Sequence, residues 1–239
     1  MNFVTKYWNY TKSPIYSLLF TLPFFLIYEI GVFFTTNDDI LVLRNGADAL
    51  MRQILSIFGL VGLYWLGLLF LLIIIITFYA QRNFWSNTEI IGNYFFFMMF
   101  ESLFWSGILF FFMSNIYLFL MNPNGQYLIQ QITLAIGAGI YEEFLFRVIL
   151  ISVIASLFSL IFKWNKKTNY ILGMFMSAGI FSVFHFIGDY GDYFSFRIFM
   201  VRFLAGIFLG MLFILRGFGI TAWSHSIYDL IVLTKITTE

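Results

Sequence analysis

Two adjacent glutamates, Glu142 and Glu143, lie in a strongly apolar segment, and Arg147 follows four residues after the second of them. Residues four apart share one face of an α-helix, so Glu143 and Arg147 can form a partly buried ion pair. The side chain of Glu142 then points about 100° away around the helix. One carboxylate is thereby neutralised and structural, and the other is available for proton transfer. A charged patch where a helix enters a bilayer would give the same pattern.

The chain contains two histidines, and both lie in apolar segments. Phe181 and His185 are four residues apart, as are His225 and Asp229, so each pair shares a face of a helix. Asp229 can therefore fix the tautomer of His225 or join it as a metal ligand. A lone histidine in a helix is usually a hydrogen-bonded packing residue. Two histidines that accompany a carboxylate pair favour a reactive site instead.

Two kinds of chemistry fit these residues. In the first, Glu142 is a general base on a water molecule that His185 helps to hold, and His225 with its neighbour Asp229 stabilises an oxyanion. In the second, Glu142, His185 and His225 bind Zn²⁺, and the metal activates the water. The residue pattern alone leaves both open. We expect no cofactor, with zinc as the alternative.

The composition places these residues in a membrane protein. Of the 239 residues 61% are hydrophobic and 10% are charged, whereas about a quarter of an ordinary globular domain is charged. Continuously apolar runs such as residues 68–78 favour helices over the alternating segments of a transmembrane β-barrel. We therefore expect an all-α fold, a polytopic transmembrane helical bundle with about seven or eight spans.

Further features of the composition exclude other classes. The net charge is +1 and no long basic cluster is present, which argues against a nucleic-acid partner. The chain has no cysteine, so disulfides, thiolate metal sites and cysteine nucleophiles are ruled out.

The elements that must position the polar residues are apolar helices. The longest apolar stretch, residues 126–162, exceeds one bilayer crossing and contains Gly137 and Gly139, so it could combine an interfacial or re-entrant helix with a spanning one. An amphipathic piece is expected at residues 47–57. We interpret residues 1–125 as N-terminal transmembrane helices and 126–239 as a catalytic helical core, together one integrated membrane domain. The other expected spans are residues 15–34, 56–79, 90–113, 170–187, 196–215 and 220–233.

Ionisable residues concentrate in the second half of the chain. Glu29 and Glu101 are isolated in the first three spans, and we interpret both as interhelical hydrogen-bonding groups. Arg197 and Arg202 favour snorkelling to the interface or pairing with an acidic residue, with the grip of a substrate carboxylate as the alternative. Basic residues in alternate connections predict a cytoplasmic N-terminus. They are Lys6, Lys12, Arg82, Lys163, Lys166 and Lys167, whereas Asp38, Asp39, Asp189 and Asp192 lie in the other connections and Arg44 and Arg52 blur the pattern.

The three motifs Glu-Glu-x-x-x-Arg, Phe-x-x-x-His and His-x-x-x-Asp follow one another on successive apolar stretches between residues 138 and 230. In this order they resemble the motif set of the CAAX-protease and bacteriocin-processing family (CPBP, or Abi). The resemblance implies an intramembrane endopeptidase, CAAX prenyl protease 2-like, in which Glu142 is the general base and Glu143 and Arg147 support it. His185 and His225 complete the site.

Members of that family have been viewed both as metalloproteases and as glutamic-type proteases, and the resemblance favours the glutamic type here. The last motif of the family often carries Asn at the place of Asp229. An ionised Asp cannot donate to an oxyanion. Asp229 therefore orients His225, is protonated or binds a metal.

Two functions of other classes compete with the protease. A non-catalytic immunity or scaffold protein of the same fold has no reason to keep both histidines in apolar stretches. A proton-coupled transporter could use Glu142, His185 and Asp229 as a relay, but no paired halves with interrupted helices are evident. We expect a peptide or membrane-protein substrate, the lipid bilayer as a partner and a multi-pass place in the cell membrane of a bacterium.

Overall fold

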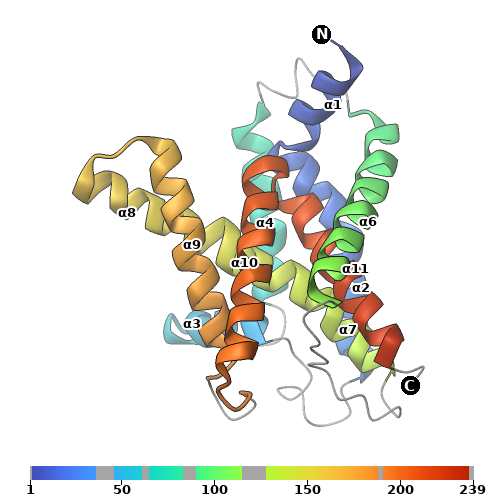
Figure 1. Cartoon of the computed structure of the whole chain (residues 1–239). Helices are drawn as coiled ribbons and strands as arrows, with labels where there is room; N and C mark the ends of the chain where they lie inside the picture. Colours follow the sequence, from blue (N-terminus) through green and yellow to red (C-terminus); the bar gives the residue numbers. More distant parts are fainter. Residues whose placement is uncertain are drawn as a thin grey trace.

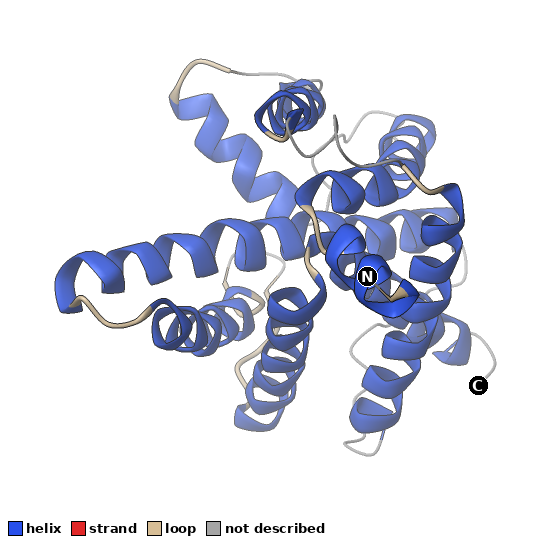
Figure 2. Cartoon of the chain, turned by 90° about the horizontal axis from the view of Figure 1, so that it is seen from above, coloured by secondary structure: helices blue, strands red, loops and turns tan. Residues whose placement is uncertain are grey.

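The computed structural model describes residues 2–35, 46–60, 65–82, 90–114, 128–187 and 191–236. Throughout these ranges the regular structure is helical and contains no strand (Figures 1 and 2). The all-α fold class predicted from the sequence is confirmed.

The helices follow the predicted apolar stretches closely. The expected span at 56–79 begins later, at Trp65, because the chain up to Ile57 belongs to the preceding amphipathic helix, which is also confirmed. In chain order the helices are α1 (Phe3–Thr11), α2 (Pro14–Thr35), α3 (Gly46–Ile57), α4 (Trp65–Ala80), α6 (Gly92–Ser114), α7 (Leu128–Gly137), the π-helices η1 (Ala138–Glu142) and η2 (Phe144–Ile151), α8 (Ser152–Phe162), α9 (Lys166–Phe184), α10 (Phe196–Arg216) and α11 (Phe218–Ile236).

Four of the described helical stretches are long and apolar enough to cross a membrane: Pro14–Phe33, Gly92–Ser114, Ile129–Phe162 and Phe196–Arg216. The helix Gly67–Ala80 is apolar but shorter. The predicted count of about seven or eight spans is roughly compatible with this set, since α9 and α11 also have 19 residues each. The chain is a multi-pass membrane protein. Its orientation and bacterial origin stay predictions, and Asp38, Asp39, Arg44 and Asp189 lie outside the described residues.

The long stretch from Ile129 to Phe162 is one continuous helical run of 34 residues. At about 1.5 Å per residue it is near 50 Å long, which exceeds the hydrocarbon core of a bilayer. Figure 1 shows it running obliquely across the bundle from α7 to α8. The sequence allowed a break at Gly137 and Gly139, but the helical run continues through both residues. It widens there into the π-helices η1 and η2.

Glycine allows this widened segment to pack closely on its neighbours. A Cβ on Gly137 would overlap the ring of Tyr28, and a Cβ on Gly139 would overlap the Ser226 hydroxyl and the Ala222 carbonyl. The two glycines therefore bring η1 against α2 and α11, which carry Tyr28 and Ser226.

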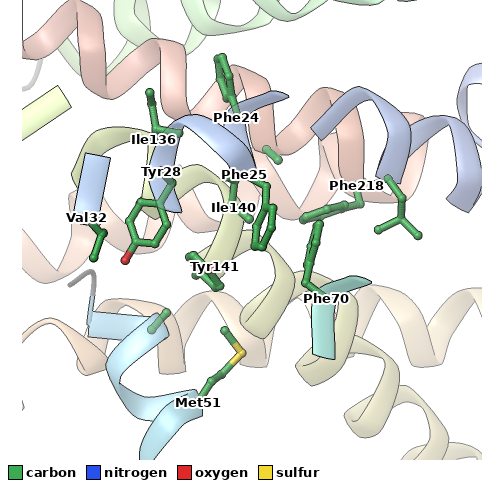
Figure 3. Packing of buried hydrophobic residues seen from close by; sticks show 13 residues of the cluster. Phe24, Phe25, Tyr28, Val32, Met51, Phe70, Ile136, Ile140, Tyr141 and Phe218 are labelled. Carbon is green, nitrogen blue, oxygen red and sulfur yellow. The ribbon is translucent and has the colours of Figure 1, made fainter. Parts of the chain in front are cut away.

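An apolar core surrounds η1 (Figure 3). Ile140 and Tyr141 from η1 are buried with Phe25 from α2 and Phe70 from α4. The rings of Phe25 and Phe70 stack with their centroids 4.4 Å apart. This cluster fixes the depth of the segment that precedes the two adjacent glutamates.

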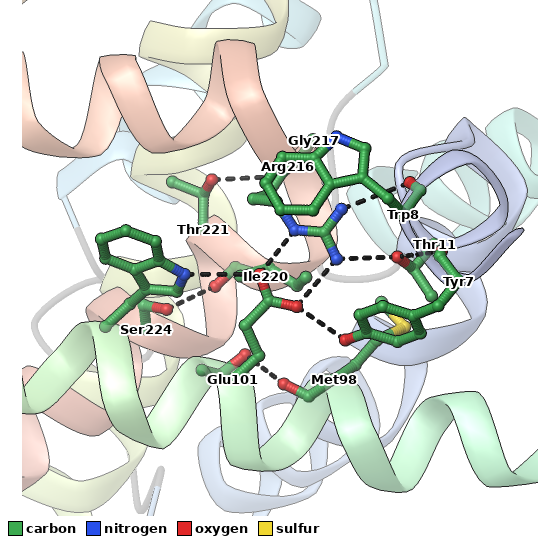
Figure 4. Close-up of polar contacts among 12 residues, drawn as sticks. Tyr7, Trp8, Thr11, Met98, Glu101, Arg216, Gly217, Ile220, Thr221 and Ser224 are labelled. Atoms are coloured by element: carbon green, nitrogen blue, oxygen red, sulfur yellow. Dashed lines mark hydrogen bonds and ion pairs between the residues drawn. The ribbon is translucent and has the colours of Figure 1, made fainter. Parts of the chain in front are cut away.

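A buried ion pair holds the opposite end of the bundle together (Figure 4). Arg216 at the end of α10 donates to both carboxylate oxygens of Glu101 on α6, with NH2 to Oε2 at 2.7 Å. The same guanidinium donates to Thr11 Oγ1 at 2.9 Å and to the Trp8 carbonyl at 3.3 Å, and the Tyr7 hydroxyl donates to Glu101 at 2.6 Å. Glu101 therefore forms interhelical hydrogen bonds, as expected, but it is not isolated.

Candidate active site

Three segments far apart in the sequence converge at the candidate site. Glu142 ends η1 and Glu143 joins it to η2, His185 follows the last residue of α9, and His225 lies inside α11. The residues Glu142, Glu143 and His225 are buried.

Glu143 is held by two basic side chains. Its Oε2 lies 3.0 Å from Nε of Arg147, which confirms the predicted ion pair, and its Oε1 accepts a hydrogen bond from Nδ1 of His225 at 2.7 Å. A carboxylate can only accept, so Nδ1 of His225 carries the proton and Nε2 faces the remainder of the site. The sequence predicted that Asp229 would orient His225. Asp229 is near, at 3.6 Å from Nε2, but Glu143 makes the shorter contact.

His185 and Glu142 face each other across a wider gap. The distance from His185 Nε2 to Glu142 Oε2 is 4.0 Å, which exceeds a direct hydrogen bond. Nδ1 of His185 lies 2.9 Å from the Phe181 carbonyl, which can only accept, so Nδ1 carries the proton. In the neutral ring, Nε2 is then an acceptor directed at the carboxylate side. The sequence placed His185 inside a helix that continues to residue 187, whereas α9 ends at Phe184.

Phe181 lies between the groups of the site. Its ring makes edge contacts with His185 at 4.9 Å and with His225 at 6.4 Å between centroids. The guanidinium of Arg147 lies over the same ring at 4.5 Å. Arg147 is 1% exposed, and its NH1 and NH2 have no hydrogen-bond partner within the described ranges. The apolar ring therefore shields a cation that is only partly satisfied.

The π-helical geometry of η1 and η2 is a feature that the sequence analysis missed. Such i→i+5 turns are rare, and they occur frequently at functional sites. The sequence offered no signal for them, except that two glycines, Gly137 and Gly139, precede the two adjacent glutamates.

The two arginines of α10 differ in their surroundings. Arg202 pairs with Asp192 and lies over the ring of Phe186 at 5.4 Å, so the predicted pairing with an acidic residue is confirmed. Arg197 is exposed.

Within the described residues no group of three or more His, Asp or Glu side chains is placed so that it could hold a metal ion. Nδ1 of His225 donates to Glu143, which leaves Nε2 as the ring nitrogen able to bind a metal, and this is the usual arrangement of a histidine ligand. The predicted zinc set Glu142, His185 and His225 therefore stays a prediction.

The fold and the site together define a class: a multi-pass helical membrane protein with a buried site of carboxylates and imidazoles. Residues 123–231 match the family model described as type II CAAX prenyl endopeptidase Rce1-like. This region, a little under half of the chain, contains all three motifs, so the match confirms the resemblance to the CPBP family. No curated protein and no solved structure matches the chain.

Proposed function

We propose that the protein is an intramembrane endopeptidase in which Glu142 activates water. One observation carries the proposal. Oε2 of Glu142 faces Nε2 of His185 across 4.0 Å, and the adjacent Glu143 is held by Arg147 and His225. This division between a structural and a reactive carboxylate is the arrangement expected where environment separates the roles of paired acids.

The gap between Glu142 and His185 suits a bridging water. Polar atoms separated by more than about 3.5 Å are commonly linked in this way. Glu142 takes a proton from the water while Nε2 of His185 accepts from it, and the water oxygen attacks the carbonyl carbon of the scissile peptide. The tetrahedral intermediate then collapses with cleavage of the C–N bond, and the protonated Glu142 gives its proton to the leaving amine. The products are a carboxylic acid and an amine, and the carboxylate of Glu142 is regenerated.

The tetrahedral oxyanion needs a hydrogen-bond donor. A doubly protonated His225 can keep Nδ1–H on Glu143 and use Nε2–H for the oxyanion. Asp229, 3.6 Å from Nε2, contributes negative charge that favours this form of the ring. In this role Asp229 does not have to donate a hydrogen bond to the oxyanion. The role therefore suits an aspartate, although the family often has Asn at this position.

We propose the glutamic route, in which Glu142 itself is the base, and zinc bound by Glu142, His185 and His225 is the alternative route. The CAAX protease family implies a membrane-associated peptide or protein as the substrate class. We propose that it reaches the site from the bilayer, and a prenylated CAAX tail is the first candidate to test because the matching family carries that name.

The test is cleavage of a panel of membrane-associated peptides, prenylated and unprenylated, by purified protein in lipid nanodiscs. Glu142→Gln keeps the side-chain shape and removes the base, and His225→Ala removes the oxyanion donor. Arg197→Gln is the matched control, because Arg197 is exposed on α10.

We expect cleavage by wild type and Arg197→Gln, and loss in both site variants. A strong chelator should leave the activity unchanged. Loss of activity in chelator, restored by zinc, would replace the glutamic route with the metal route. Equal behaviour of wild type and Glu142→Gln would contradict the protease.

A further inference from the structure

Helix α3 buries a charged residue in the face that it turns toward the bundle. Asp48 is fully buried beside Ala47 and Met51, which are 0% and 7% exposed, whereas Ile54 and Ile57 are 44% and 79% exposed. Placing a carboxylate inside an apolar bundle is costly unless it is paired and hydrogen-bonded. The partners of the buried Asp48 of α3 should therefore indicate a role other than packing.

Asp48 belongs to a chain of polar contacts that ends beside the candidate base. The Tyr28 hydroxyl donates to Asp48 Oδ2 at 2.7 Å, and Arg52 Nε donates to Oδ1 at 2.7 Å. NH2 of Arg52 lies 3.7 Å from Oε1 of Glu29, and the same oxygen accepts a hydrogen bond from the Tyr141 hydroxyl at 2.8 Å. Tyr141 directly precedes Glu142 in η1.

The same end of α3 also lies against the residue that precedes His185. A Cβ built on Gly46 would lie 3.3 Å from the ring of Phe184, which directly precedes His185. Figure 1 shows α3 at the end of α9 from which His185 follows. Helix α3 therefore contacts the immediate neighbours of both Glu142 and His185.

Tyr141 and Glu142 are consecutive residues of the π-helix η1, so the position of one side chain is coupled to that of the other through their shared backbone turn. The ring of Tyr141 packs against that of Tyr28 with the centroids 5.0 Å apart (Figure 3). The Tyr141 hydroxyl donates a hydrogen bond to Glu29. Fixing the side chain of Tyr141 fixes the rotation of the backbone turn that also carries Glu142.

We infer that Tyr141 and Asp48 are positioning residues, which hold Glu142 at its distance from His185 through Glu29, Arg52 and Tyr28. The inference rests on the proposed function for its catalytic consequence. It makes α3 part of the reaction machinery, although α3 lies outside the matched residues 123–231.

The test compares two tyrosine variants that each remove one hydroxyl from a glutamate. Tyr141→Phe breaks the bond to Glu29, and Tyr7→Phe breaks the bond of 2.6 Å to Glu101 at the other end of the bundle. Tyr7 is therefore a matched control for the loss of one buried hydrogen bond. We expect kcat of Tyr141→Phe to fall about ten- to hundredfold with KM within about twofold, and Tyr7→Phe to keep both constants.

A second measurement needs no substrate. Because the chain has two histidines, isotope-labelled histidine gives two imidazole signals, which a His225→Gln variant assigns. We expect Tyr141→Phe and Asp48→Asn to shift the His185 signal, and Tyr7→Phe to leave it in place. A His185 signal that is unchanged in Tyr141→Phe and Asp48→Asn, or shifted equally in Tyr7→Phe, would overturn the inference. Wild type without cleavage would instead contradict the proposed function, and the imidazole signals would still decide the positioning role.

Discussion

Two buried Glu–Arg pairs in this protein have the same chemistry but different surroundings. Arg216 uses all three guanidinium nitrogens, with Glu101, Thr11 and the Trp8 carbonyl as acceptors. Arg147 places Nε 3.0 Å from Glu143, and its NH1 and NH2 have no hydrogen-bond partner within the described ranges. In the saturated pair, Glu101–Arg216, every guanidinium nitrogen has an acceptor. In the unsaturated pair, Glu143–Arg147, two nitrogens have none within the described ranges.

The difference indicates what each pair is for. A buried ion pair repays the cost of leaving water only when further hydrogen bonds satisfy both partners. The pair of Glu101 meets this condition, so we assign it to stability. The pair of Glu143 gives one carboxylate oxygen to His225 instead, and buried polar groups left unsatisfied in a native structure frequently mark a functional site.

The largest expected effect on stability comes from breaking the saturated pair. Arg216→Met leaves the charge of Glu101 buried without its partner, and this should lower the free energy of unfolding by about 3–5 kcal/mol. Chemical denaturation in detergent measures the loss. Adding Glu101→Gln should recover part of it, and the kcat of the folded fraction should be unchanged. A large drop in kcat would break the assignment of this pair to stability.

Arg147→Met should lower stability less, and activity more, than Arg216→Met. The loss of Arg147 leaves Glu143 paired with His225 and removes a buried cation with two unsatisfied nitrogens, so it should cost only about 1–2 kcal/mol of stability. Activity should fall about ten- to hundredfold, because Glu143 then loses one of the two groups that hold it. Parallel denaturation and cleavage assays check this. A loss of stability as large as that of Arg216→Met, with kcat retained, would remove the distinction between the pairs.

Thr11→Val tests a single bond of the saturated network. The Thr11 hydroxyl accepts from Arg216 NH2 at 2.9 Å, and a hydrogen bond to a charged group contributes about 1.5–3 kcal/mol. We expect a loss of stability at the lower end of that range, without any change in cleavage. The midpoint of thermal unfolding in nanodiscs is a sufficient measurement. An unchanged midpoint would indicate that the network is less saturated than its geometry suggests.

The parts of the site that follow helical periodicity could be predicted from the sequence. The pairing of Glu143 with Arg147 and the closeness of His225 to Asp229 both depend on a spacing of four residues. The hydrogen bond between Glu143 and His225 could not be predicted, because the two residues are 82 positions apart and meet only through tertiary packing. That packing depends on the glycines of the long helix.

Arg216 shows the same limit for the fold. At the end of an apolar span it has the sequence context of a snorkelling residue, and its partner Glu101 is 115 positions away. The helices themselves could be placed from apolar length alone. The widening into a π-helix could not, since it has no periodic signature in the residues.

The most direct measurement pairs Glu142→Gln with Glu101→Gln and follows both cleavage and unfolding in the same preparations. Each variant removes one negative charge, from the buried Glu142 or the partly buried Glu101, without changing the side-chain shape. We expect Glu142→Gln to lose about 10²- to 10⁴-fold in kcat with its unfolding midpoint retained. Glu101→Gln should unfold earlier and keep its kcat per folded molecule. Similar losses of stability and activity in both variants would contradict the division into a structural pair and a catalytic site.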